Sequence, residues 1–387
     1  MVAEIILLVS FLAIAWSYLL YPLIAFIAAG RKKEKSAPVS DDELPAVSIL
    51  MPVYNEEKVI EEKIEKLLAS EYPAAKIEIL IGSDASDDQT DSIINRYSSQ
   101  NSRIKFFRSD SRSGKASILN RLASEAKGDI IMITDANVMP CAVTVRVLAS
   151  QFVFSPETGL CDTNVKTVSS EKEGLAYQEN LYSRFESALK RAEGRAWGTM
   201  TGPYGGFYAV RKELFPVLPD NFLCDDLFVG LTVLRTGFRS ANATEAIVTE
   251  DTEGDILDQY KRRVRIATGS FQNLFYFGLF PGKSATASVS YFSHKVLRWL
   301  SPIFLILIFM TTVILSGHSL FYFCLLVAQL FLLLLPAFDL MLDLLKINLP
   351  MLRFSTQFLI MNVALAVGLI KALRGVEEGT WKPTKRY

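Results

Sequence analysis

Long apolar runs lie toward both ends of this chain, and a region of mixed pattern separates them. Residues 5–29 form a run of nearly uninterrupted apolar positions, enough to cross a hydrocarbon core about 30 Å thick. The run is longer than the core of a cleaved signal peptide, and Glu4 rather than a positive charge precedes it, so we expect a retained transmembrane helix. The basic cluster at residues 31–33 follows directly, and the positive-inside rule predicts that the next segment is cytosolic.

A second group of apolar segments begins at residue 266. Residues 266–280 are rich in aromatic side chains but interrupted by polar ones, a pattern typical of a helix lying in the membrane interface. Three candidate spans follow, the last of them diluted by Arg353, Gln357 and Asn362; they cover residues 300–315, 320–336 and 351–370. Three spans would place the C-terminus outside, whereas the basic tail is typical of a cytosolic segment. Either the last segment is re-entrant or the charge rule fails here.

Between these two groups, strand-like and helix-like stretches alternate. The expected strands are residues 47–53, 77–83, 104–108 and 130–134, and the expected helices are 56–70, 89–99 and 115–126. Strict alternation of this kind implies right-handed crossovers and a parallel sheet covered by helices on both faces. The sequence therefore predicts an α/β domain with flanking transmembrane α-helices, and ligands should bind at the carboxyl ends of its strands.

These patterns divide the chain into six parts. We expect an N-terminal transmembrane helix, a cytosolic linker, a catalytic domain, interfacial amphipathic helices, C-terminal transmembrane helices and a tail, at residues 1–30, 31–45, 46–265, 266–298, 299–374 and 375–387.

Composition narrows the choice of partners. Half of the 387 residues are hydrophobic, in accord with a share of the chain in the membrane. The 41 basic and 41 acidic residues balance, so the chain lacks the basic excess with which proteins neutralise nucleic-acid phosphates, and we expect no nucleic acid. The four cysteines are far apart and have no metal-ligand spacing, which suits isolated thiols in a reducing cytosolic domain.

Polar motifs follow the expected strands. Pro52, Tyr54 and Glu56 lie where the first strand turns into a helix, and a strand end with a helix cap explains them as well as a binding site does. Asp84 lies at the tip of the second strand, ahead of acids that can cap the next helix, and its carboxylate can accept hydrogen bonds from a base or a ribose. Lys115 opens a helix where the macrodipole disfavours a cation, which suggests a bound anion such as a diphosphate; a solvated lysine is the alternative.

The fourth strand ends in Asp135-Ala136-Asn137. Carboxylate and carbonyl oxygens are the ligands that hard divalent cations prefer, so Asp135 and Asn137 can hold Mg²⁺ or Mn²⁺ beside a diphosphate. Taken alone, this pattern is weak evidence for a metal site, because aspartate is also common in turns at strand ends.

In this order the motifs PVYNE, SDASDD, RSGK and TDAN resemble the nucleotide-binding half of an inverting family-2 glycosyltransferase. The resemblance continues through the glycine-rich residues 202–211 and through residues 224–238. It implies a nucleotide-diphospho-sugar transferase (GT-A, Rossmann-like) domain that binds a UDP-sugar with Mg²⁺ or Mn²⁺. It also implies that Asp226 is the catalytic base and Asp225 its acidic neighbour, although both can cap the next helix. Adjacent acids tune each other's pKa, as a base requires.

Two departures from the family pattern matter. The acceptor-side motif keeps arginines at Arg262 and Arg265, which can bind a diphosphate or form an exposed basic helix, but Ile266 replaces its tryptophan. The loss of an aromatic face for a sugar ring argues against processive elongation. Asn137 replaces the second acid of the family's metal motif, which should weaken metal affinity.

With its flanking spans, the chain is similar to the membrane synthases of cellulose, hyaluronan, chitin and poly-N-acetylglucosamine, and to ceramide glucosyltransferase. The resemblance implies a hexosyltransferase of the bacterial inner membrane that extends a polysaccharide or oligosaccharide, and it leaves room for a partner subunit for export. A lipid acceptor is the alternative. A transporter with a nucleotide-binding domain is a remote third alternative, because the spans, apart from the last, lack the ionisable residues that mark transport paths.

Overall fold

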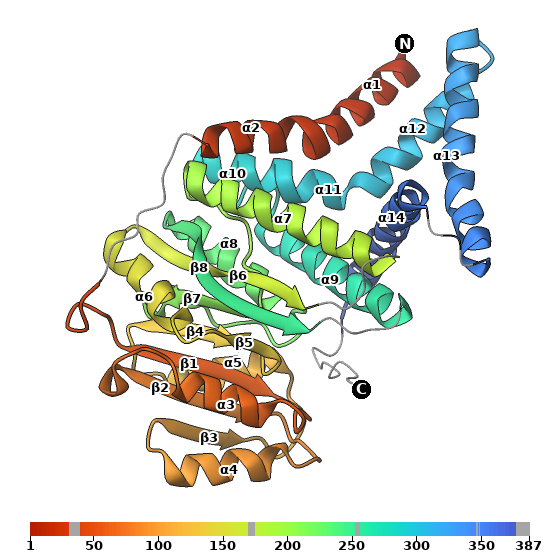
Figure 1. Cartoon of the computed structure of the whole chain (residues 1–387). Helices are drawn as coiled ribbons and strands as arrows, with labels where there is room; N and C mark the ends of the chain where they lie inside the picture. The colour runs from red at the N-terminus through yellow and green to blue at the C-terminus, as the bar shows by residue number, and fades with distance from the viewer. Residues whose placement is uncertain (31–38, 169–174, 252–255, 346, 348, 377–387) are drawn as a thin grey trace.

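The computed structural model describes residues 1–30, 39–168, 175–251, 256–345, 347 and 349–376. A mixed sheet with helices on both faces forms one part, and long helices gather on one side of it (Figure 1). The basic cluster at residues 31–33 and most of the tail, on which the expected membrane orientation rests, lie outside the described residues.

The sheet has eight strands in the order β3-β2-β1-β4-β7-β6-β8-β5. Their bounds are β1 Val47–Val53, β2 Ile77–Ser83, β3 Ile104–Arg108, β4 Ile130–Thr134, β5 Val138–Pro140, β6 Thr158–Val168, β7 Phe207–Arg211 and β8 Arg239–Asp251. The first four strands are parallel, as predicted. The second half is mixed, because β7 runs antiparallel to β4 and β6, and β5 runs antiparallel to β8.

The hydrophobic core lies on both faces of the sheet. All seven residues of β1 are buried, and its side chains alternate between two clusters: Ile49 and Met51 face one, and Leu50 faces the other. Two helices on each side supply much of the packing, namely α3 Ile60–Leu68 and α6 Thr144–Phe154 on the first face and α5 Lys115–Glu125 and α8 Asp225–Thr236 on the second. Burial on both faces explains why these strands read as continuous apolar runs.

The predicted helices are present with shifted bounds. The first begins at Ile60 rather than residue 56, because residues 54–59 form the turn that leaves β1. The second is α4 Thr90–Gln100. The strand-to-helix turns at Asn55 and Ala85 have positive φ of 53° and 56°, a conformation that is uncommon outside glycine and that clusters at functional sites.

Three described helices are long and apolar enough to span a membrane, or up to four if one bent pair counts as a span. The first is continuous from Val2 to Ala29 and comprises α1 Val2–Ala15, a π-helical turn Trp16–Leu20 and α2 Tyr21–Ala29. The others are α13 Leu320–Leu344 and α14 Pro350–Arg374. The bent pair joins Ala285–Trp299, which contains α10 and α11, to α12 Ser301–Leu315 at 59°.

The expected boundary at residue 266 is wrong, because it falls inside α9 Ile256–Phe277. This helix packs closely on α14: a Cβ at Gly368 would lie 2.5 Å from Ala267 Cβ. The polar residues that dilute the last span are buried in the protein. Arg353 pairs with Asp339 of α13 at 3.2 Å, and Asn362 accepts a hydrogen bond from Ser301 at 2.6 Å. The low hydropathy of α14 therefore reflects contacts with neighbouring helices.

Candidate active site

Lys115 joins the two halves of the predicted site. Its ammonium lies 3.0 Å from Asp135 Oδ1, beyond the end of β4, and 3.6 Å from Asp225 Oδ2, at the start of α8. Burial opposes its charge, but the two carboxylates more than compensate, so the pKa of Lys115 lies above its ordinary value. The protein's own acids thus account for a lysine at this helix N-terminus, and contact of Lys115 with a diphosphate stays a prediction.

Asp225 and Asp226 form an acidic pair at the start of α8. Asp225 is buried, and its Oδ2 makes no hydrogen bond within the described part of the chain. Asp226 is half-buried, and its Oδ1 accepts a hydrogen bond from the adjacent Leu227 N–H at 2.8 Å. Burial and then the charge of Asp225 raise the pKa of Asp226 to about 6, although Lys115 opposes this shift. The N-cap residue is Cys224, with no side-chain cap, so capping explains little of the pair.

Gly205 leaves room for the Asp226 carboxylate. Its φ is +89°, and a Cβ at this position would lie 2.6 Å from Asp226 Oδ2 and 3.1 Å from its Cγ. The glycine-rich segment before β7 therefore packs its backbone directly against the acidic pair. Any side chain at residue 205 would have to displace the carboxylate.

The carboxylate of Asp84 is engaged within the protein. It is fully buried and accepts hydrogen bonds from Arg112 Nε at 2.9 Å, from the Ser113 N–H at 2.6 Å and hydroxyl at 3.1 Å, and from the Gly114 N–H at 3.2 Å. These bonds fix the turn that leads into Lys115. Direct contact of Asp84 with a base or ribose stays a prediction.

Tyr54, Pro52 and Glu56 line the end of β1. The Arg112 guanidinium lies 3.4 Å from the centre of the Tyr54 ring, so these two side chains stack at the edge of the site. Pro52 is buried within the strand, and the Glu56 N–H donates to Thr90 Oγ1 at 2.8 Å, which ties the turn after β1 to α4. All three residues lie at the predicted strand end.

Asp135 and Asn137 leave the end of β4 together, and both are partly exposed. The Asn137 amide donates to Glu250 Oε1 at 3.2 Å, so its amide oxygen points away from that carboxylate. The described residues hold no cluster of three or more His, Cys, Asp or Glu suited to a metal. Two oxygen ligands still fit Mg²⁺ or Mn²⁺, because Mg²⁺ sites commonly use one or two carboxylates and take further ligands from a substrate's phosphates and water.

The two predicted arginines of α9 lie in different surroundings. Arg262 is half exposed and its guanidinium is 4.0 Å from Glu250 Oε1, so it reaches the metal-side edge of the site. Arg265 is exposed. The carbonyl of the next residue, Ile266, accepts a bond from Cys224 Sγ at 3.6 Å, which brings this turn of α9 to the start of α8. Roles for both arginines stay predictions.

The sequence reasoning missed several residues of this region. Glu250 accepts hydrogen bonds from Asn137 and Tyr204, and it reaches the site from the far end of β8. Lys63 is fully buried and donates to Thr134 Oγ1 at 2.6 Å and to the Val138 carbonyl, which supports the turn carrying Asp135 and Asn137. Its spacing from Ile60 and Ile64 on the buried face of α3 was a usable signal, whereas nothing local marks Glu250.

Comparisons with known proteins bear on the family and the fold. The family model described as "Glycosyl transferase family 2" matches residues 48–215, and the model described as "Glycosyl transferase family group 2" matches residues 177–338. A mannosyltransferase of Pyrobaculum calidifontis, solved with GDP-Man and Mn²⁺, superposes with a TM-score of 0.68 over 95% of this chain and 99% of that one, at 21% identity. This likeness shows the fold, and the predicted GT-A α/β class is confirmed.

Curated relatives match over part of their length. A probable glycosyltransferase of Bacillus subtilis, YdaM, is 26% identical over 59% of this chain and 56% of the relative. Glycosyltransferase AglD of Haloferax volcanii is 30% identical over 55% of this chain and 34% of its own length. The poly-β-1,6-N-acetyl-D-glucosamine synthase of Staphylococcus aureus is 25% identical over 62% and 58%. The chain thus spans between a third and three fifths of the curated relatives it matches.

Proposed function

This chain belongs to glycosyl transferase family 2, and we propose that it transfers a sugar from a nucleoside-diphosphate sugar, with inversion, to an acceptor hydroxyl at the membrane. One observation carries the proposal. Lys115 holds the donor-side Asp135 and the acidic pair Asp225-Asp226 in a single site, with ammonium-to-carboxylate distances of 3.0 and 3.6 Å. A carboxylate that can act as a base therefore lies beside the groups suited to a diphosphate.

In this proposal Asp226 removes the proton from the acceptor hydroxyl. The oxygen of that hydroxyl attacks the anomeric carbon as the bond to the diphosphate breaks, and the nucleoside diphosphate leaves with the electron pair. A base works best when its pKa lies near the working pH, and a pKa of about 6 keeps Asp226 mostly ionised at neutral pH. Burial and then the charge of Asp225 maintain that pKa, and the charge of Lys115 reduces the repulsion between both acids and the donor's phosphates.

The donor's phosphates also need positive charge. Asp135 and Asn137 would hold a divalent cation through their side-chain oxygens, and Glu250 orients the Asn137 amide for that role. Such a cation, when bound, stabilises the negative charge of the departing diphosphate. Arg262 and Arg265 would supply further positive charge from α9. Pro52, Tyr54, Glu56 and Asp84 would form the nucleoside side of the pocket.

We propose a UDP-sugar as donor and a polysaccharide or oligosaccharide as acceptor. The Staphylococcus aureus relative that is named a poly-β-1,6-N-acetyl-D-glucosamine synthase supports the choice of acceptor, as do the candidate spans, and the motif resemblance supports the choice of donor. A lipid acceptor is the second candidate. Ile266 favours it, because this side chain is 45% exposed where a stacking aromatic would serve a growing sugar chain.

A donor panel tests the proposal. Purified protein is incubated with UDP-, GDP- and other nucleotide sugars and Mn²⁺ or Mg²⁺, and nucleotide release and product size are measured. We expect nucleotide release with a UDP-sugar. Preference for a GDP-sugar would refute the choice of a uridine nucleotide as donor. A long polymer would refute the inference from Ile266. No release with any donor would refute the enzymatic proposal.

A further inference from the structure

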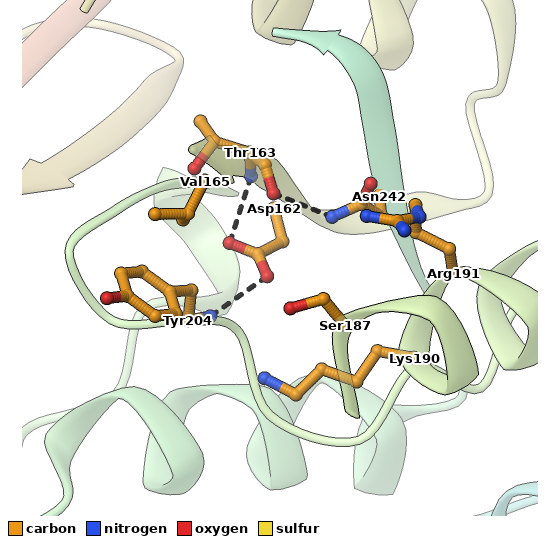
Figure 2. A pocket seen from close by; sticks show the side chains of 8 residues that line it. All are labelled: Asp162, Thr163, Val165, Ser187, Lys190, Arg191, Tyr204 and Asn242. Atoms are coloured by element: carbon orange, nitrogen blue, oxygen red, sulfur yellow. Dashed lines mark hydrogen bonds between the residues drawn. The ribbon is translucent and has the colours of Figure 1, made fainter. Parts of the chain in front are cut away.

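A pocket lies beside the candidate active site, between strands β6 and β8 and helix α7 Leu175–Trp197 (Figure 2). Its polar lining comes from these three elements and from the glycine-rich segment, and it includes Asp162, Ser187, Lys190, Arg191, Tyr204 and Asn242. Apart from Tyr204, whose hydroxyl donates to Glu250, none of these residues has a part in the donor chemistry described above.

The pocket and the proposed base share one stretch of backbone. The Tyr204 N–H donates to Asp162 Oδ2 at 2.9 Å, which holds the carboxylate over the pocket (Figure 2). The next residue, Gly205, packs against Asp226 Oδ2 on the other side. A molecule bound in the pocket therefore lies one residue of backbone away from the base.

One face of α7 offers hydrogen-bond donors to this pocket. Ser187, Lys190 and Arg191 have the spacing of neighbours on a single helix face, and Figure 2 shows Lys190 extending beneath Asp162. Within the described part of the chain, the Lys190 ammonium has no hydrogen bond and no carboxylate within 4.0 Å, and the Ser187 hydroxyl has no hydrogen bond. Arg191 is held by Asn164 Oδ1 at 3.2 Å. Asp162, the carboxylate that Lys190 helps to ionise, lies beyond 4.0 Å, so this half-buried ammonium can still contact a negative ligand directly.

The opposite face of α7 contacts the first membrane span. The Tyr21 hydroxyl donates to Glu193 Oε1 at 2.7 Å, and the rings of Phe26 and Phe185 lie 6.2 Å apart. Figure 1 shows α7 running between the sheet and the helices α2, α10 and α11. The pocket therefore lies on the side of the sheet that faces the membrane helices, from which a membrane-bound acceptor would approach.

Asp162 does not oppose a negative ligand strongly. Burial raises its pKa to about 7, although Lys190 and the two backbone N–H groups of Tyr204 and Thr163 favour the ionised form. A substantial share of Asp162 is therefore neutral near pH 7, and an anion bound at Lys190 would raise that share.

We propose that this pocket binds an anionic group of the acceptor, a phosphate or a carboxylate, with Lys190 as its cation and Ser187 as a hydrogen-bond donor. The inference rests on the proposed function and narrows its acceptor. The attacked hydroxyl belongs to an acidic saccharide or to a saccharide carried on a lipid diphosphate.

Matched acceptors test the pocket. With the best donor, we compare methyl β-D-glucuronide with methyl β-D-glucoside, and glucose on a short alkyl diphosphate with alkyl glucoside. We expect kcat/KM to favour a charged member by about ten- to hundredfold, because hydrogen bonds to charged groups are the stronger ones. A preference in the glucuronide pair would identify a carboxylate as the bound group, and a preference in the alkyl diphosphate pair would identify a diphosphate. Lys190→Met should bring the ratio toward one, and Lys190→Arg should keep most of it.

The ratio cancels general effects on folding or on donor use. Lys66→Met, in an exposed ion pair with Glu62 on α3, is the control and should keep the wild-type ratio. A wild-type ratio at or below one in both pairs, or a ratio that Lys190→Met leaves unchanged, would overturn the inference while leaving the glycosyl transfer established.

A binding measurement serves if no sugar transfer occurs at all. Amine-reactive labelling of Lys190, quantified by mass spectrometry, should be slowed by a charged acceptor and not by its neutral partner. Equal labelling with every acceptor would refute the anion site without reference to turnover.

Discussion

Gly205→Ala is the sharpest structural test of the base. A Cβ would lie 2.6 Å from Asp226 Oδ2, where an ordinary contact begins near 3.4 Å, so the carboxylate must move by about 0.8 Å. A misplacement of about 1 Å at a reacting group can cost roughly a hundredfold in rate. We therefore expect kcat for sugar transfer to fall by about that factor.

Backbone strain must be separated from the displacement of Asp226. Gly205 has φ of +89°, and alanine in such a conformation costs on the order of 1–2 kcal/mol of stability wherever it occurs. Gly278 has φ of +76°, and a Cβ there would meet nothing within 4 Å, so Gly278→Ala carries the strain without the clash. Thermal unfolding temperatures should fall similarly in both variants, and only Gly205→Ala should lose turnover. Full activity in folded Gly205→Ala would refute the assignment of Asp226.

Three further changes test other parts of the site. Because the pKa of Asp226 is raised to about 6, kcat/KM should fall as the pH drops through 6. Asp225→Asn removes a like charge and should therefore move this acidic limb of the pH–rate profile to lower pH. An acidic limb that stays in place or moves to higher pH would contradict the coupling of the two acids. Asn137→Asp should bind Mn²⁺ more tightly in a titration followed by electron paramagnetic resonance with UDP present, and unchanged affinity would remove Asn137 from the metal site. Lys63→Met should lower the unfolding free energy by about 1–3 kcal/mol in chemical denaturation, because Thr134 and the Val138 carbonyl lose a buried donor, whereas exposed Lys66→Met should have little effect.

The parallel half of the sheet and the residues at its strand ends were predictable from the sequence. Strands β1, β2 and β4 are mostly apolar and nearly all of their residues are buried, as their sequence pattern predicts. The edge strand β3 has only one buried residue and was recognised from the alternation of strands and helices. Lys115, Asp135 and the acidic pair meet as the motif order implied.

The remaining features depend on contacts between distant segments. The antiparallel strand β7 pairs with β4 and β6, which no local pattern specifies. Glu250 meets Asn137 across more than a hundred residues, and Arg353 is buried against Asp339 of another helix. Local pattern also placed the start of an interfacial helix at residue 266, although α9 runs through that point and packs against α14 there.

The most direct test of the central claim compares wild type with Asp226→Asn in the transfer of a sugar from its nucleotide donor. The anomeric configuration of the product is read by nuclear magnetic resonance, and nucleotide release gives the rate. The account predicts inversion by the wild-type protein and a loss of about 10²- to 10⁴-fold in the variant, the usual contribution of a general base. A product with retained configuration, or wild-type turnover by folded Asp226→Asn, would contradict it.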